Sequence, residues 1–465
     1  MKLQLKTLAA LAVFALAVTS CSKDDGGDGV PFSQKSVEEN KRVVENSAIQ
    51  VANTIDEMKD LETTDAAVSL GNLFDMADPL ESKTKKKSKV SATIGVIAGI
   101  QTGDNSIHDL FTVMKSPGEL GEDPETLQEI WDEVIGTYSW NAETKTWDYA
   151  ANVDKVVFEF PSTDGGMSND AALTVSNYAG ITTSNPLDTE YSGDLPASLN
   201  MDLKVGSKTL IDYVFSAEYN SDGIPTKVAS DLTIESFMFT VDLTNSNTEV
   251  SASYKFTHGE KVIMEITGST QGDFSDANIE ANTETHTDTW TWTNYVWNDA
   301  TQQYDEIEVT EIDEWEEVNA EEIARSANAK FQVVDIAIMG NVNIKALVDE
   351  LDQIYPDDYW DQEDFDEKAA ADKEAEVINK YLNLYALNVV ANEKIAEAEA
   401  YVVQENYGGE YYDYWIDLRL KFGDGSFVDM DTYMEEGFED FIKEINSMIS
   451  ELNGEYNWGL EAIDY

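Results

Sequence analysis

The residues that could carry out chemistry are unevenly supplied in this chain of 465 residues. It has 91 aspartates and glutamates but only three histidines and a single cysteine, Cys21. His108, His258 and His286 fall in an expected helix, a turn and a strand, and they form no His-x-x-x-His pair. A zinc site or a histidine-based triad therefore lacks its usual components. The sequence also contains no Gly-x-Ser-x-Gly elbow, no phosphate-binding glycine loop and no dinucleotide fingerprint.

Among the side chains that commonly take part in catalysis, carboxylates are abundant, whereas histidine and cysteine are scarce. Two well-placed acids suffice for glycoside hydrolysis, so a carboxylate-dependent glycoside hydrolase is an alternative function. Among 91 acidic residues, however, no particular pair stands out. We therefore predict no catalytic residues.

Two acidic stretches have the oxygen-rich composition that suits Ca²⁺, but neither has the EF-hand spacing of ligands. Solvated loops, and the negative charge favoured at helix N-termini, explain both stretches. We predict no metal site and no cofactor, with calcium as the alternative. The acidic residues concerned are Asp357, Asp358, Asp361, Glu363, Asp364 and Asp366 in the first stretch, and Asp424, Asp429 and Asp431 in the second.

The best binding candidate is an aromatic stretch from Thr287 to Trp297. On a strand, Trp290 and Trp292 share one face, whereas Tyr295 and Trp297 lie on the other. An exposed pair could stack against the sugar rings of a ligand. Paired tryptophans are more often buried against a helix, so we expect burial and keep ligand stacking by Trp290 and Trp292 as the alternative.

The net charge restricts the partners. Thirty Lys and Arg residues against 91 Asp and Glu residues give a formal charge of −61. Nucleic acid is excluded as a partner because phosphate binding needs clustered Lys and Arg side chains. The one dense basic run, from Lys83 to Lys89, could contact lipopolysaccharide phosphates, but a solvated loop is the expected role.

The N-terminus has the pattern of a secretory signal peptide. Lys2 and Lys6 precede an apolar run from Leu8 to Val18 that is shorter than the roughly 18 residues a bilayer-spanning helix needs. The run ends in Val18-Thr19-Ser20-Cys21, which resembles the lipobox of bacterial lipoproteins. The resemblance implies cleavage after residue 20, and a diacylglyceryl group and a further acyl chain such as palmitate on Cys21. Three acyl chains would anchor the protein firmly.

The residues that follow Cys21 indicate where in the cell the protein is located. Lys23, Asp24 and Asp25 resemble the export signal of surface lipoproteins of the Bacteroidetes, which implies an outer-membrane anchor with the protein facing the cell exterior. A flexible Gly/Asp tether over residues 21–32 is the simpler interpretation, and the two are compatible.

Residues 33–137 form an expected helical region. Apolar spacings of three, four and seven predict an amphipathic helix from Ser36 to Met58 and a second from Asp65 to Ala77. A shorter helix is expected over Ser106 to Met114. Asp123-Pro124 marks the start of another helix, which Gly136 ends.

Residues 138–320 form an expected antiparallel β region, because the apolar period changes to two. Turns at Gly206-Ser207, Asn245-Ser246-Asn247 and His258-Gly259 join consecutive strands into a meander. Tyr138–Asp148 and Tyr295–Asp305 share a Tyr-x-Trp-Asn-x-x-Thr-x-x-aromatic-Asp pattern. Favourable hairpin chemistry explains this likeness better than a duplicated module, which is the alternative.

Residues 321–465 form an expected mixed α/β region. We predict a buried strand from Phe331 to Ile338 and a helix from Ile344 to Ile354. The longest helical pattern runs from Asp361 to about Gln404. A strand over Tyr412 to Phe422 and a helix over Thr432 to Leu452 follow.

The expected fold class is α+β: N-terminal helices, a large antiparallel β-meander resembling a half-barrel, and long C-terminal helices packed on a sheet. The expected function is that of a lipid-anchored cell-surface lipoprotein that binds a ligand or partner and is not an enzyme. Its partners would be the outer membrane, through the anchor, and an outer-membrane protein, a lipid or a glycan. Besides the glycoside hydrolase, a structural acidic surface protein is an alternative.

Overall fold

The computed structural model describes most of the chain from Gly29 onward. The described residues are 29–57, 61–77, 79, 127–152, 154–182, 194–221, 223–298, 303–354, 366–408 and 411–430, together with 433, 443, 446 and 450.

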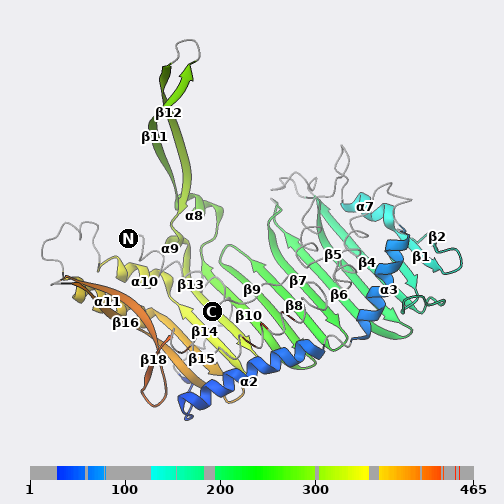
Figure 1. Ribbon diagram of the computed structural model, residues 1–465, viewed down its shortest axis with the longest axis horizontal. Helices are drawn as coiled ribbons and strands as arrows, with labels where there is room; N and C mark the ends of the chain where they lie inside the picture. The colour runs from blue at the N-terminus through cyan, green and yellow to red at the C-terminus, as the bar shows by residue number, and fades with distance from the viewer. Residues whose placement is uncertain are drawn as a thin grey trace.

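A single sheet of sixteen strands organises the described residues (Figure 1). Its order is β18-β17-β16-β15-β14-β13-β10-β9-β8-β7-β6-β5-β4-β3-β1-β2, so nearly every strand lies beside its neighbour in sequence. The pairs are antiparallel except β1 with β3, which is parallel. The sheet therefore continues without interruption from the expected β region into the expected mixed region.

The first half of the sheet follows the predicted antiparallel meander except at β1, which lies parallel to β3. Its strands are β1 (Gly136–Asn141), β2 (Thr146–Ala150), β3 (Lys155–Phe160), β4 (Ala171–Thr182), β5 (Asp194–Val205), β6 (Lys208–Tyr219), β7 (Pro225–Ile234), β8 (Phe237–Asn245), β9 (Glu249–His258) and β10 (Lys261–Gly272).

The period-two pattern separates the two faces of this half. Leu203 pairs with Ile211, and Ile211 pairs with Ile234, which places their side chains on one apolar face. The adjacent row on the other face begins with the pair Asp202 and Asp212. Gly206 closes the β5–β6 turn with a φ of 55°, a conformation that glycine adopts without strain.

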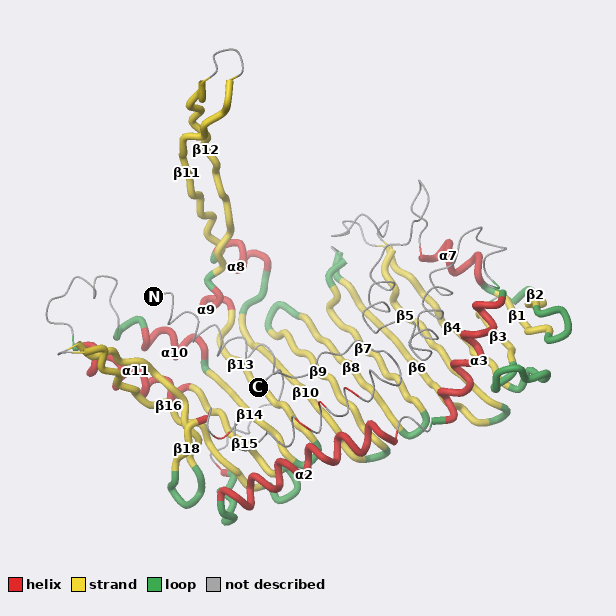
Figure 2. Tube along the Cα trace, viewed as in Figure 1, coloured by secondary structure: helices red, strands yellow, loops and turns green. Residues whose placement is uncertain are grey.

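The predicted N-terminal helices are confirmed and lie on the apolar face. They are α2 (Val37–Asp56) and α3 (Glu62–Met76), followed by α7 (Leu127–Val134). α2 runs across the strands along one end of the sheet (Figure 2). Its first half packs against Ile336 and Phe422, and Val51 near its end packs against Phe237 and Phe256.

α3 covers the opposite end of the strand order. Its Leu70 and Phe74 join one core cluster with Phe158 of β3. The ring centroids of Phe74 and Phe158 lie 5.1 Å apart in an edge-to-face arrangement. The helices thus hold distant parts of one long sheet together by burying apolar side chains from both ends of it.

The second half of the sheet comprises β13 (Ala324–Val333), β14 (Ile336–Val342), β15 (Leu382–Asn388), β16 (Glu393–Gly408), β17 (Tyr411–Lys421) and β18 (Phe427–Asp429). The helices α10 (Ile344–Leu351) and α11 (Glu367–Tyr381) lie between β14 and β15 in the sequence and pack on the same apolar face, around Ala400, Val402 and Leu418. The prediction of a single strand from Phe331 to Ile338 is wrong, because this segment contains the end of β13 and the start of β14. Val334, at a φ of 51°, turns the chain between β13 and β14.

The long C-terminal helix predicted from Asp361 to Gln404 is also wrong. α11 ends at Tyr381, and residues 393–408 form a strand. Glu and Ala are strong helix formers, which makes this segment resemble a helix. Its residues also alternate, with Ala396, Ala398 and Ala400 on one face, and pairing with β17 along its length decides the outcome.

Three other predictions lie outside the described residues: the basic run Lys83–Lys89, the helix over Ser106–Met114, and most of the helix over Thr432–Leu452. Within the described ranges, no helix has the length and apolar character needed to cross a membrane.

Candidate binding hairpin

A two-stranded hairpin is inserted in the sequence between β10 and β13, which pair directly with each other in the main sheet. It consists of β11 (Thr283–Asn298) and β12 (Gln303–Val318), which pair in register from Thr283 opposite Val318 to Asn298 opposite Gln303. Sixteen residues per strand give it a length of about 50 Å. It projects from the end of the sheet opposite to α2 (Figure 1).

The base of the hairpin is tied to the sheet by backbone hydrogen bonds and two short helices, α8 (Asp276–Ala281) and α9 (Ala320–Ile323). The Asp273 amide donates to Ile323 O at 2.8 Å, and the Asn319 amide donates to Asn282 O at 2.9 Å. Gly272 permits this close approach, since a Cβ there would lie 2.0 Å from Ile323 O. The hairpin therefore leaves the sheet from a defined base.

Trp290 and Trp292 lie on this hairpin and are exposed, at 57% and 44% of their surface. The expectation that they are buried against a helix is therefore wrong. The helices pack on the main sheet, and the hairpin stands outside that layer, so burial is set by the tertiary arrangement. The predicted sharing of faces holds, because Trp290 and Trp292 are two residues apart on β11 and Tyr295 lies on the other face.

A third tryptophan, which we did not single out from the sequence, joins the same face. Trp315 of β12 pairs with His286 of β11, and their rings stack with centroids 5.5 Å apart and planes 18° apart. Trp315 is 45% exposed. Side chains of β12 alternate between two faces, and this alternation could have drawn attention to Trp315. Only the register of the hairpin, however, assigns Trp315 to the same face as Trp290 and Trp292.

The opposite face of the hairpin carries a row of threonines. Thr289 pairs with Ile312 and Thr291 with Thr310, and the two threonine hydroxyls lie 3.4 Å apart. Ile312 and Tyr295 are each 59% exposed on this face. Both faces of the hairpin thus present apolar groups to solvent.

The N-terminal segment is attached at the other end of the sheet. The Ser33 amide donates to Lys394 O, and the Lys394 amide donates to Pro31 O, both at 2.8 Å. The Lys394 ammonium lies 5.4 Å from the ring centroid of Phe32 and 2.8 Å from Glu397 Oε2. The Lys394 side chain is only 7% exposed, so its charge is buried against the partly exposed Glu397 and Phe32.

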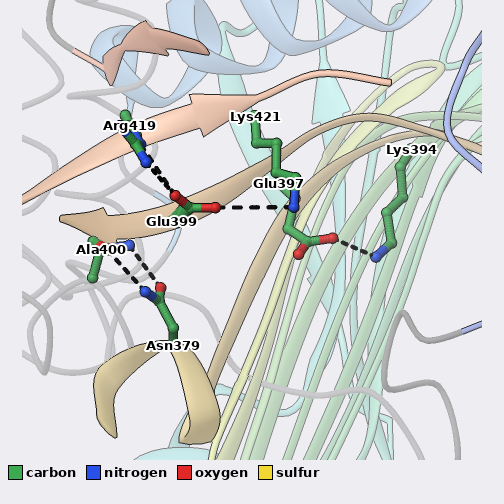
Figure 3. A network of polar contacts seen from close by, with 7 residues as sticks. All are labelled: Asn379, Lys394, Glu397, Glu399, Ala400, Arg419 and Lys421. Carbon is green, nitrogen blue, oxygen red and sulfur yellow. Dashed lines mark hydrogen bonds and ion pairs between the residues drawn. The ribbon is translucent and has the colours of Figure 1, made fainter. Parts of the chain in front are cut away.

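A row of charged side chains continues from this point across β16 and β17 (Figure 3). Glu399 accepts a hydrogen bond of 3.2 Å from Arg419 Nε and lies 3.9 Å from Lys421 Nζ. On the opposite side of β16, the Asn379 amide pairs with both backbone groups of Ala400. These contacts fix β16, the strand to which the N-terminal segment attaches.

The carboxyl groups with shifted pKa values serve structural contacts. The Ser426 hydroxyl and amide donate to Asp424 and lower the pKa of its carboxyl. Ser162 acts in the same way on Asp170, where its backbone amide is the larger influence and also lowers the pKa. In the described part of the chain, no group of three or more His, Cys, Asp or Glu residues is arranged to hold a metal ion. Asp424 and Asp429 are instead engaged with Ser426 and Tyr401.

The remaining predicted site residues lie outside the described residues: Cys21, Lys23, Asp24 and Asp25 of the anchor, the acidic stretch from Asp357 to Asp364, and Asp431. Comparison of the chain with protein-family models, with curated proteins and with solved structures gives no match.

Proposed function

We propose that this chain is a lipid-anchored outer-membrane lipoprotein that faces the cell exterior and binds a partner or ligand through the β11–β12 hairpin, without catalysing a reaction. The observation that carries the binding part is the exposure of Trp290, Trp292 and Trp315 on one face of a hairpin that projects from the sheet. Aromatic side chains of this size are usually buried, and exposed groups of them mark interaction surfaces.

The position of the N-terminal segment supports the anchored part of the proposal. In the sheet register, Met264 near the start of β10 pairs with Val333, and this row continues through Ile336 and Asn388 to Glu393, next to Lys394. The hairpin leaves from the other end of β10, after Gly272. The described chain therefore begins next to the end of the strands away from the hairpin, and an anchor on that side of the protein would leave the tryptophans pointing away from the membrane.

Metabolic labelling tests the anchor. Labelled palmitate should enter the wild-type chain and not the Cys21→Ala variant. Protease added to intact cells should digest the wild-type protein, which is the result expected of a surface-facing protein. Labelling of the Cys21→Ala variant, or full protection until the cells are lysed, would overturn this part of the proposal.

Native mass spectrometry tests the binding. The protein extracted in mild detergent from its own membrane should carry mass beyond its acyl chains, and this mass should be lost from a Trp290→Ala/Trp292→Ala variant. Trp415→Ala is the matched control, because Trp415 is exposed on β17, away from the hairpin. A bare lipidated wild-type chain, or equal loss from the control, would contradict hairpin-mediated binding.

A further inference from the structure

The charge of the hairpin restricts what can bind to it. No lysine or arginine occurs between Lys261 and Arg325, whereas β12 alone contains eight aspartates and glutamates. Anionic partners such as lipid phosphates would be repelled. Two copies of the hairpin would also repel each other, since like charges across an interface are costly. The molecules that could bind to the hairpin are therefore cationic or neutral.

The shape of the hairpin favours a protein over a sugar. Small-molecule ligands bind mostly in concave sites, and a projecting two-stranded ribbon offers no concavity of its own. Among the strands that the structure describes, β11 and β12 pair only with each other, so each presents an outer edge of backbone donors and acceptors. A polypeptide can use these edges as well as the side chains, whereas a sugar cannot form a strand.

The aromatic face complements a cationic segment. Trp290 and Trp292 are two residues apart on one strand, which separates their rings by about 7 Å along it. Arginine and lysine side chains are attracted to the faces of tryptophan rings, and arginine can also stack on them. Glu284 and Asp288 are exposed on the same face of β11 as the tryptophans and would pair with further cations. A neutral sugar would gain nothing from the net negative charge.

We propose that the occupant of the hairpin is a basic segment of a partner protein, with Lys or Arg side chains lying over Trp290, Trp292 and Trp315 and pairing with the surrounding carboxylates. This inference rests on the proposed binding role of the hairpin and names its partner class. It also accounts for the exposure of a long hairpin that is marginally stable alone, because a bound partner would cover its apolar groups.

Fluorescence titration of the full mature chain with octa-arginine tests the chemistry. At about 150 mM NaCl, where contacts between distant surface charges are largely screened, the Trp290→Ala/Trp292→Ala variant should bind octa-arginine roughly tenfold more weakly than the wild type. Trp415→Ala should change the affinity by less than about twofold, because it leaves the hairpin intact. Circular dichroism of each variant confirms that it is folded. Equal effects from both variants would show only general attraction to an acidic protein and would overturn the proposal.

Photocrosslinking in the native membrane tests the partner class. Benzoylphenylalanine at Asn294, which is exposed on the tryptophan face, should crosslink to a polypeptide segment with a net positive charge. The same group at the exposed Tyr412 of β17 should not give that product. Crosslinks to a glycan, to a second copy of the chain, or to nothing would overturn the basic-partner inference. The palmitate and protease tests of the anchor are unaffected by any of these outcomes.

Discussion

The carboxylate of Glu235 accepts hydrogen bonds from the amide and the hydroxyl of Thr63, at 3.0 and 3.1 Å, although 172 residues separate the two in the sequence. Thr63 lies in the first turn of α3, where backbone amides lack helical partners. Leu61, at the N-cap of that helix, provides no side-chain cap. A glutamate from the β7–β8 turn therefore caps α3 and joins the helix to the sheet.

Glu235→Gln should destabilise the fold in a pH-dependent manner. Burial favours the neutral form of Glu235, but hydrogen bonds from Thr63 and Lys208 outweigh it and lower the pKa of the carboxyl below its ordinary 4.5. The wild type should be more stable than the variant by about 1 kcal/mol at pH 7. Because the folded-state pKa is the lower one, this difference should be present above about pH 4.5 and disappear as the pH falls through the folded-state value. Urea unfolding at several pH values measures it, with Glu218→Gln on an exposed part of β6 as the control. A difference that stays unchanged down to the lowest pH at which both proteins remain folded would contradict the charged cap.

Lys394→Met should loosen the N-terminal segment. The substitution keeps the apolar stem but removes the charge between Phe32 and Glu397. We expect a loss of about 1–3 kcal/mol in the free energy of unfolding and faster hydrogen exchange of the Ser33 amide. Lys368→Met is the control, because its ion pair with Asp372 is half exposed on both sides and should contribute less than about 0.5 kcal/mol. Equal losses from the two substitutions would contradict a buried role for Lys394.

Asn379→Ala should leave two backbone groups of β16 without hydrogen-bond partners. The Asn379 amide donates to Ala400 O at 2.8 Å and accepts from the Ala400 amide at 2.7 Å. Ala400 is buried, so two backbone groups would lose their partners at a cost of about 1–3 kcal/mol. Hydrogen exchange of the Ala400 amide should accelerate. Asp372→Ala, on the exposed side of the same helix, should leave that amide protected.

Gly272→Ala should disturb the base of the hairpin. The new Cβ would lie 2.0 Å from Ile323 O, a backbone atom that cannot move without shifting the start of β13. A cost of about 1–3 kcal/mol is expected for such overpacking, and limited proteolysis at the hairpin base should become faster. Gly340→Ala in β14 is the control, because its Cβ would meet the Leu384 side chain at an ordinary 3.4 Å. Similar stability of both variants would show that the base is adaptable.

The sequence alone determined the elements whose signals are local. The period-two alternation and the turn at Gly206 identified β5 and β6, and the apolar stripe from Val37 onward identified α2. These signals suffice because an amphipathic element needs only one buried face, and its residue spacing records which face that is.

Only the tertiary structure decided the features that depend on what lies alongside an element. Residues 393–408 are rich in helix formers, yet their pairing with β17 makes them a strand. Trp290 and Trp292 have the composition of a core, yet no described helix covers the hairpin that carries them. The cap on Thr63 comes from the distant Glu235. In each case the outcome depends on which element lies alongside the residue in the folded chain, and the local sequence pattern does not encode that neighbour.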